Sequence, residues 1–180
     1  AQIGGDVHGD REIDAQNRYV LPGGVDVHVH LSPSRRPEPG IEVWVDDFHS
    51  GSQAAIAGGV TTIGNMSFQW NNETLRHPIE RDLEAARRDA IVDYILHPVL
   101  TDPSAESLEQ IPELAADGHT SLKIFLTRAN FDARIDDYLQ AMKLAAESGS
   151  ITIVHCEDAA LIRYIGKELV AQGKGSPRYW

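Results

Sequence analysis

The sequence predicts an α/β protein that forms part of a (β/α)8 TIM-type barrel. Five short apolar segments each precede a segment with helical periodicity, and strands that alternate with helices form parallel sheets. The histidines and the lysine with catalytic potential lie in or near the carboxyl ends of these strands, where such barrels place their active sites. A doubly wound open sheet also fits the alternation, but this placement favours the barrel. Because five units cannot close eight strands, we expect about the first five β/α units.

We expect two regions along the chain. Residues 1–22 are polar, with short apolar alternations at 12–14 and 19–21, and they predict part of an N-terminal β-strand side domain. Residues 23–180 carry the partial barrel. The first barrel strand is expected at 25–31 and the second at 60–66. Between them, a proline-containing loop over 32–45 precedes a helix that Asp46 or Asp47 caps and that ends at Gly58 and Gly59.

The later elements repeat this pattern. A helix is expected around 77–89, a strand over 91–97 that Pro98 stops, a helix that begins at Asp102 and Pro103 and ends at Gly118, and a strand over 121–126. The next helix ends at Gly149 and should bury one face, made of Ile135, Leu139, Met142 and Ala146. A fifth strand over 151–155 and a helix over about 158–172 complete the predicted elements.

Composition excludes several classes of protein. The chain has 180 residues, 42% of them hydrophobic, which suffices for one globular domain with a core. A formal net charge of −11 argues against binding to nucleic acid or to an anionic membrane surface. The single cysteine, Cys156, excludes an internal disulfide framework, so we expect a reducing compartment, the cytoplasm. No apolar run approaches the length of a membrane span.

The first candidate site lies on the first strand, which alternates strictly between apolar and polar residues. A strand has a side-chain period of two, so Asp26, His28 and His30 share one face and the valines the other. Neighbouring imidazoles are unfavourable in a buried position unless something engages their nitrogens, and a divalent metal does so. Asp26 could orient this site. The alternative is a half-exposed strand whose histidines have no joint role.

The second candidate is Lys123, which lies within an apolar strand between Leu122 and Ile124. A charged, unpaired lysine inside such a strand costs several kcal/mol. A depressed pKa would leave a neutral amine that can react with CO2 to give a carbamate, an anionic oxygen ligand. The alternative, equally compatible with the spacing, is an outward side chain whose ammonium group reaches solvent.

The third candidate is His155, at the end of the fifth strand and just before a helix, where it would face the mouth of a barrel. A buried histidine bonded to the backbone is an alternative of similar weight. His97 ends the third strand and is a candidate for the layer behind the metal ligands, although structural packing explains it as well.

Taken together, these sites resemble the amidohydrolase superfamily. The resemblance rests on PGGVDVHVH at 22–30, GVTT at 59–62, Lys123 in SLKIF and His155 in VHCED. Within the superfamily, DDFHSG at 46–51, the DY…H pattern at 93–97 and GSPRY at 175–179 are most similar to the cyclic amidohydrolases, the hydantoinase and dihydropyrimidinase group. The PGIE segment at 39–42 is more similar to dihydroorotases and allantoinases.

This resemblance implies a centre with two divalent metal ions, usually zinc. His28 and His30 would bind the more buried ion, a carboxylated Lys123 would bridge both ions, and His155 would bind the exposed one. A hydroxide between the metals would hydrolyse the C–N bond of a cyclic amide such as a hydantoin or dihydropyrimidine. The implied partners are a small cyclic amide or ureide and further copies of the chain, as a dimer or tetramer.

The resemblance also has two departures. Family members need a second histidine for the exposed metal and a proton-shuttling aspartate, both on later strands that these 180 residues do not include. In hydantoinases and dihydropyrimidinases a tyrosine that supports the oxyanion follows the lysine by five residues, and here that position is Arg128. Arg128 could stabilise an oxyanion or bind a substrate carboxylate.

Two other functions compete with cyclic amide hydrolysis. One is a truncated, catalytically inactive fragment or a dihydropyrimidinase-like scaffold, a group that has lost its metal ligands. Retention of His28, His30, Lys123 and His155 argues against the scaffold. The other is a deaminase of the same superfamily, and such deaminases usually lack the bridging lysine that Lys123 would supply.

Overall fold

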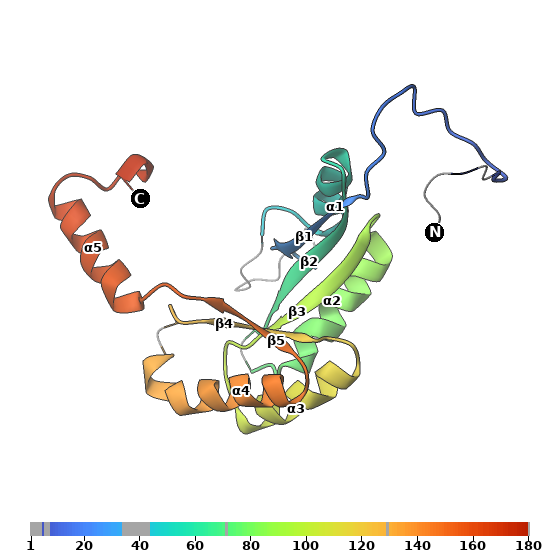
Figure 1. The fold of residues 1–180 in the computed structure, drawn as a ribbon. Coiled ribbons are helices and arrows are strands. Elements are labelled where there is room, and N and C mark those ends of the chain that lie inside the picture. Colours follow the sequence, from blue (N-terminus) through green and yellow to red (C-terminus); the bar gives the residue numbers. More distant parts are fainter. Residues whose placement is uncertain (1–4, 6–7, 34–43, 71, 129, 180) are drawn as a thin grey trace.

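The protein forms a single curved sheet of five parallel strands, seen here in a computed structural model that describes residues 5, 8–33, 44–70, 72–128 and 130–179. Neighbouring strands follow the order of the chain (Figure 1). The strands are β1 Gly24–Val29, β2 Val60–Phe68, β3 Asp93–Val99, β4 Ser121–Phe125 and β5 Ile151–His155.

A helix follows every strand. The helices are α1 Phe48–Ala57, α2 Arg76–Asp89, α3 Ala105–Ala116, α4 Ile135–Glu147 and α5 Ala159–Ala171, with short 3-10 turns at Asp132–Arg134 and Pro177–Tyr179. Helices α1 to α4 lie along the sheet, whereas α5 extends away from it (Figure 1). A doubly wound sheet would reverse its strand order, so the sequential order from β1 to β5 confirms five units of a partial barrel.

Local signals set most helix ends correctly. Asp47 caps α1 by accepting a hydrogen bond from the Ser50 amide at 2.8 Å. Asp158 caps α5 through the Leu161 amide, also at 2.8 Å. Gly59 and Gly149 adopt positive φ angles of 84° and 73° after α1 and α4, and only glycine takes this conformation without strain.

The predicted start of α3 is wrong. Ser104, not Asp102, caps the helix, and its side chain accepts from the Ser107 amide at 3.2 Å. The Asp102 carboxylate instead pairs with Arg134 at 3.1 Å, and the same guanidinium donates to the Pro103 carbonyl at 2.8 Å. A tertiary ion pair therefore holds the aspartate that local patterns assign to the cap.

The predicted end of the third strand is also wrong, because Pro98 lies inside β3 and pairs in register with Ser67. Proline has no amide hydrogen to donate to a neighbouring strand, so it removes one hydrogen bond from a sheet. Here β3 meets β4 only through Val99 and Lys123. This short ladder tolerates the missing donor.

Helix α4 buries a different face from the one expected. Ile135 and Leu139 are 43% and 54% exposed, and Ala146 is exposed as well. The buried face consists of Tyr138, Ala141 and Ala145. Tyr138 decides the rotation of the helix, because its ring stacks on Phe131 and its hydroxyl donates to the Thr101 carbonyl at 3.1 Å.

The hydrophobic core lies between the sheet and helices α1 to α4. Its fully buried members include Phe48, Ile63, Leu100, Leu114, Leu122, Ile124 and Tyr138. No residue within β1 is fully buried, and Val25 and Val27 are 62% and 53% exposed. The first buried residue is Leu31, which follows the strand. This strand is an edge of the sheet, so its apolar face is covered only in part.

The described residues between His8 and Gly23 form no strand. The short strands expected at 12–14 and 19–21 are therefore not formed, and the assignment of 1–22 to a side domain stays a prediction. The PGIE segment at 39–42 lies outside the described residues. Among the described helices, none has the length and apolar character needed to cross a membrane.

Candidate active site

The histidines of β1 converge, as their spacing predicts. The Nε2 atoms of His28 and His30 are 3.3 Å apart. Two nitrogens that each lie 2.0–2.1 Å from a tetrahedral zinc ion are about 3.3–3.4 Å apart. The pair therefore fits two ligands of one metal. Burial, followed by the charges of His28 and Lys123, lowers the pKa of His30. A lowered pKa keeps this imidazole neutral near pH 7, the form that binds metals.

Lys123 lies inside the sheet and its side chain does not reach solvent, since the residue is 2% exposed. This burial contradicts the alternative in which the ammonium group reaches solvent. The ammonium nitrogen sits 4.7 Å from the ring centre of Phe125, and burial lowers the pKa of Lys123. The Phe125 ring lies 5.8 Å from the Phe68 ring, which lies 5.6 Å from His30 between centroids, so Lys123 and His30 flank one row of aromatic rings. The structure thus brings His28, His30 and Lys123 together.

His97 lies behind this group, at 6% exposure. Its Nδ1 is 2.6 Å from the Ser121 hydroxyl. Burial lowers the pKa of His97, with smaller contributions from His28 and Lys123 in the same direction, while the Val27 backbone raises it. Gly64 makes room for this imidazole, because a Cβ atom there would lie 2.5 Å from Nε2. His97 therefore supports the strands that carry the candidate ligands.

His155 and Asp26 are less closely tied to the group. His155 ends β5 as predicted and faces the Phe125 ring at a centroid distance of 5.3 Å, but its Nε2 interacts with the Glu157 carboxylate. Asp26 accepts a hydrogen bond from the His28 amide at 3.1 Å, so it orders the backbone of β1. Within the described ranges, no three His, Cys, Asp or Glu side chains are grouped closely enough to hold a metal. The four-residue ligand set stays a prediction.

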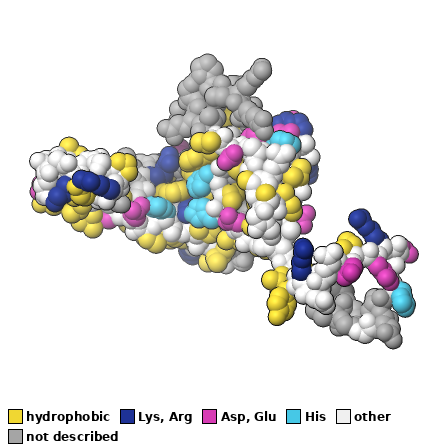
Figure 2. Space-filling view, turned by 90° about the horizontal axis from the view of Figure 1, so that it is seen from above, with side chains coloured by type: hydrophobic (Ala, Val, Ile, Leu, Met, Phe, Trp, Pro, Cys, Tyr) yellow, Lys and Arg dark blue, Asp and Glu magenta, His cyan; other side chains and the backbone are white. Residues whose placement is uncertain are grey.

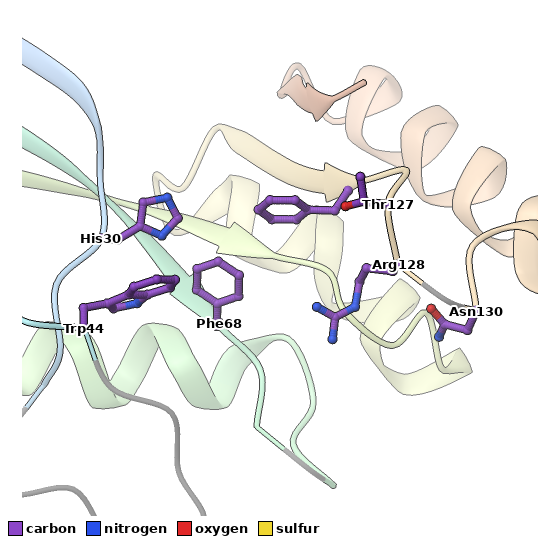
Figure 3. A pocket seen from close by; sticks show the side chains of 7 residues that line it. His30, Trp44, Phe68, Thr127, Arg128 and Asn130 are labelled. Atoms are coloured by element: carbon purple, nitrogen blue, oxygen red, sulfur yellow. The ribbon is translucent and has the colours of Figure 1, made fainter. Parts of the chain in front are cut away.

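An open cavity of about 580 Å³ adjoins His30, a volume typical of sites for small molecules. Its lining residues come from the last positions of β2 and β4 and from the segments that follow β1 and β4: His30, Trp44, Phe68, Phe125, Thr127, Arg128 and Asn130 (Figure 3). The Trp44 ring lies 4.5 Å from His30 and 5.8 Å from Phe68 between centroids. In the view from above, histidine side chains gather near the middle of the molecule (Figure 2).

The aromatic wall of this cavity was missed in the sequence. Phe68 belongs to a polar aromatic segment at the end of β2, a position that predicts a role in a barrel. Trp44 follows a long proline-containing loop, and nothing in its local pattern places it beside His30. Together with Phe125, these rings give the cavity flat apolar surfaces beside the histidine pair, suited to a planar ring.

A buried polar link connects β1 to α2, and it was also missed. Asn65, fully buried in β2, accepts from the Leu31 amide at 2.8 Å and donates to Asp82 at 3.1 Å. Burial raises the pKa of Asp82 to about 6, although the neighbouring Arg81 opposes this shift. Leu31 directly follows His30. The link therefore fixes the end of the strand that carries the histidine pair.

Comparison with known proteins identifies a family and several relatives of this chain. The model of the amidohydrolase family matches residues 19–175. D-phenylhydantoinases of Escherichia coli O9:H4 (strain HS) and of Escherichia coli strain SE11 are each 40% identical over 169 residues, which cover 93% of this chain and 36% of theirs. The chain thus spans about a third of the length of the curated relatives it matches.

Solved structures of related enzymes share the fold of this chain. A crystal structure of a D-hydantoinase matches with a TM-score of 0.80 at 35% identity, covering 99% of this chain and 39% of that one. A dihydropyrimidinase from Brevibacillus agri matches with a TM-score of 0.73 at 32% identity, covering 88% and 34%. The curved sheet is accordingly part of a TIM barrel. The match over residues 19–175 shows that this chain belongs to the amidohydrolase family.

Proposed function

We propose that this chain forms the metal-binding part of an enzyme that hydrolyses a C–N bond in a cyclic amide of the hydantoin or dihydropyrimidine type. The observation that carries the proposal is the 3.3 Å separation of the Nε2 atoms of His28 and His30. Relatives named D-phenylhydantoinase and dihydropyrimidinase support the substrate class. The cavity beside His30, with its aromatic walls, has a size that suits a small ring.

In this proposal His28 and His30 would hold one divalent ion, His155 would hold a second, and a carboxylated Lys123 would supply oxygen ligands. Bound divalent ions, with zinc suggested by the nitrogen donors, would polarise the amide carbonyl and lower the pKa of water. Asp26 and His97 act on the ligands indirectly. Asp26 holds the His28 amide, and His97 holds the strands behind it through Ser121.

Lys123 is suited to carboxylation because burial favours its neutral amine. The amine attacks CO2, a new N–C bond forms, and one proton is released to give the carbamate anion. The product is an oxygen ligand on a buried strand where a free ammonium group would be costly. Metal ions held by His28 and His30 would in turn neutralise the carbamate.

The first test is the metal content of the protein, by elemental analysis of a sample of known intact mass. For the enzyme of which this chain forms part, we expect about two ions per molecule and turnover of a hydantoin or dihydropyrimidine. His30→Ala should lose metal, whereas His49→Ala, at an exposed position on α1, should retain it. Absence of metal together with absence of turnover would contradict the proposal and favour a scaffold function.

Lys123→Ala tests the bridging role. We expect loss of paired metals and of activity, with partial recovery on addition of a short-chain carboxylate that replaces the carbamate. Isotopically labelled bicarbonate should give a carbamate NMR resonance in the unmodified protein and none in the variant. Turnover at the unmodified level in Lys123→Ala would refute the role.

We also propose a cytoplasmic location and a homo-oligomeric state. The single cysteine supports the first. Sedimentation of the metal-loaded protein tests the second, and a monomer at micromolar concentration would exclude it.

A further inference from the structure

The cavity beside His30 contains an arginine that has no acidic partner among the described residues. Arg76, Arg81 and Arg134 each pair with a carboxylate, at 2.8 Å to Asp117, 2.6 Å to Glu73 and 2.5 Å to Asp137. The Arg128 side chain makes no such pair within the described ranges, and it is exposed to the cavity. In Figure 3 its guanidinium extends into the space between Phe68 and Asn130.

The segment that carries Arg128 is anchored on both sides. The Arg128 carbonyl accepts from the Phe131 amide at 3.0 Å, and the Phe131 ring stacks on buried Tyr138 at 5.0 Å. Arg134 then ties the segment to Asp102. The backbone of Arg128 is therefore held at a defined place by contacts that leave its guanidinium available. Such preorganisation favours ligand binding because less conformational freedom is lost.

The charges around Arg128 favour an anion. Among the described residues, the seven that line the main cavity include no acid. Arg128 also lines a second cavity of about 200 Å³, which reaches toward Gln69 and Thr101. The acid in that lining, Asp82, is already engaged by Asn65 and by Arg81. Since Trp44, Phe68 and Arg128 line both cavities, the guanidinium lies where the two meet.

We propose that Arg128 forms an anion-binding subsite that selects cyclic amides carrying a carboxylate on an exocyclic substituent. This inference rests on the proposed function, which puts the reacting ring at the histidine pair. The ring would lie against Trp44 and Phe68, and its substituent would extend toward the junction of the cavities. A guanidinium binds a carboxylate through two parallel hydrogen bonds, and Asn130 and Thr127 line the same wall.

The test compares two ligands of nearly equal shape by calorimetry on the metal-loaded protein. One is a hydantoin with a carboxymethyl substituent, and the other carries a carbamoylmethyl group. We expect the carboxylate to bind roughly ten- to a hundredfold more tightly, as for hydrogen bonds between charged groups. Arg128→Gln should remove this preference by weakening the binding of the carboxylate far more than the binding of the neutral ring. Arg128→Lys should retain part of it.

Arg87→Gln is the matched control, because Arg87 is exposed on α2, outside the cavity, and its replacement changes the net charge equally. It should keep the preference. Equal binding of both rings to the unmodified protein would overturn the anion subsite while leaving the proposed function intact. A parallel loss of both ligands in Arg128→Gln and Arg128→Lys would indicate a steric role and also overturn it. Failure of both rings to bind the unmodified metal-loaded protein would contradict the proposed function as well.

Discussion

At the scale of single residues, burial decides which polar groups have chemical consequences. Lys123 and Asp82 are both 2% exposed, but the side chains that surround them differ. Asp82 is bound by Asn65 and lies beside Arg81, so its role is structural. Lys123 faces aromatic and imidazole rings, an environment that disfavours its charge and makes it available for reaction.

Asp82 should make the free energy of unfolding depend on pH. Its pKa is about 6 in the folded chain and 3.8 in an ordinary environment. Between these values the folded state holds more protons than the unfolded state. The contribution of Asp82 to stability is therefore complete below about pH 4 and is lost as the pH rises through about 6. The difference corresponds to about 3 kcal/mol.

Urea titrations of the protein and of Asp82→Asn between these pH values measure this effect. We expect the difference in unfolding free energy between the two proteins to change by about 3 kcal/mol across the range. Glu109→Gln, an exposed change of the same charge on α3, should leave the profile as it is. A constant difference between the unmodified protein and Asp82→Asn would exclude the raised pKa.

At the scale of elements, the site depends on how β1 is held against β2. Asn65 is the main polar link, because its side chain joins the Leu31 amide to the Asp82 carboxylate. Without the Asn65 side chain, the Leu31 amide and the Asp82 carboxylate would remain buried and would lose this hydrogen bond. Gly64, one residue earlier, lets the backbone of Val27 and the ring of His97 approach β2 closely. Two adjacent residues of one strand thus position the histidine pair.

Asn65→Ala should destabilise the fold and loosen β1. Leaving buried hydrogen-bonding groups without partners costs about 1–3 kcal/mol each. We expect a lower urea midpoint, faster hydrogen exchange at the Leu31 amide and weaker metal binding. Gln140→Ala, an exposed change on α4, serves as the control. Unchanged exchange at Leu31 would show that Asn65 does not hold the strand.

At the scale of the whole molecule, the five units differ in how well they are covered. Helices α1 to α4 each bury residues against the sheet, whereas α5 buries only Gly166. Its Leu161 and Tyr164 are 64% and 62% exposed. A helix of 13 residues without packing is only marginally stable in water.

Hydrogen exchange of this 180-residue chain should reflect that difference. We expect the amides of α5 to exchange at least about a hundredfold faster than those of α2, because local opening of α5 exposes little new apolar surface. Mass spectrometry of peptides from both helices measures the two rates. Equal protection of α5 and α2 would contradict this prediction.

Much of this architecture could be predicted from the sequence because it depends on local periodicity. The five strands, the caps at Asp47 and Asp158 and the convergence of His28 and His30 all follow from residues near one another in the chain. The errors arose where a distant partner intervened. Asp102 pairs with Arg134 and does not cap α3, and the hydrogen bond from Tyr138 to Thr101 sets which face of α4 is buried.

By itself, the sequence determined the alternation of strands and helices, the shared face of the histidine pair and the family of the chain. Only the tertiary structure decided that Lys123 is buried, that Asn65 joins β1 to α2, and that Trp44 and Arg128 line the same cavity as His30. The physical reason is the range of the interactions. Side-chain period and capping act over a few residues, whereas burial, ion pairing and cavity shape depend on segments brought together by the sheet.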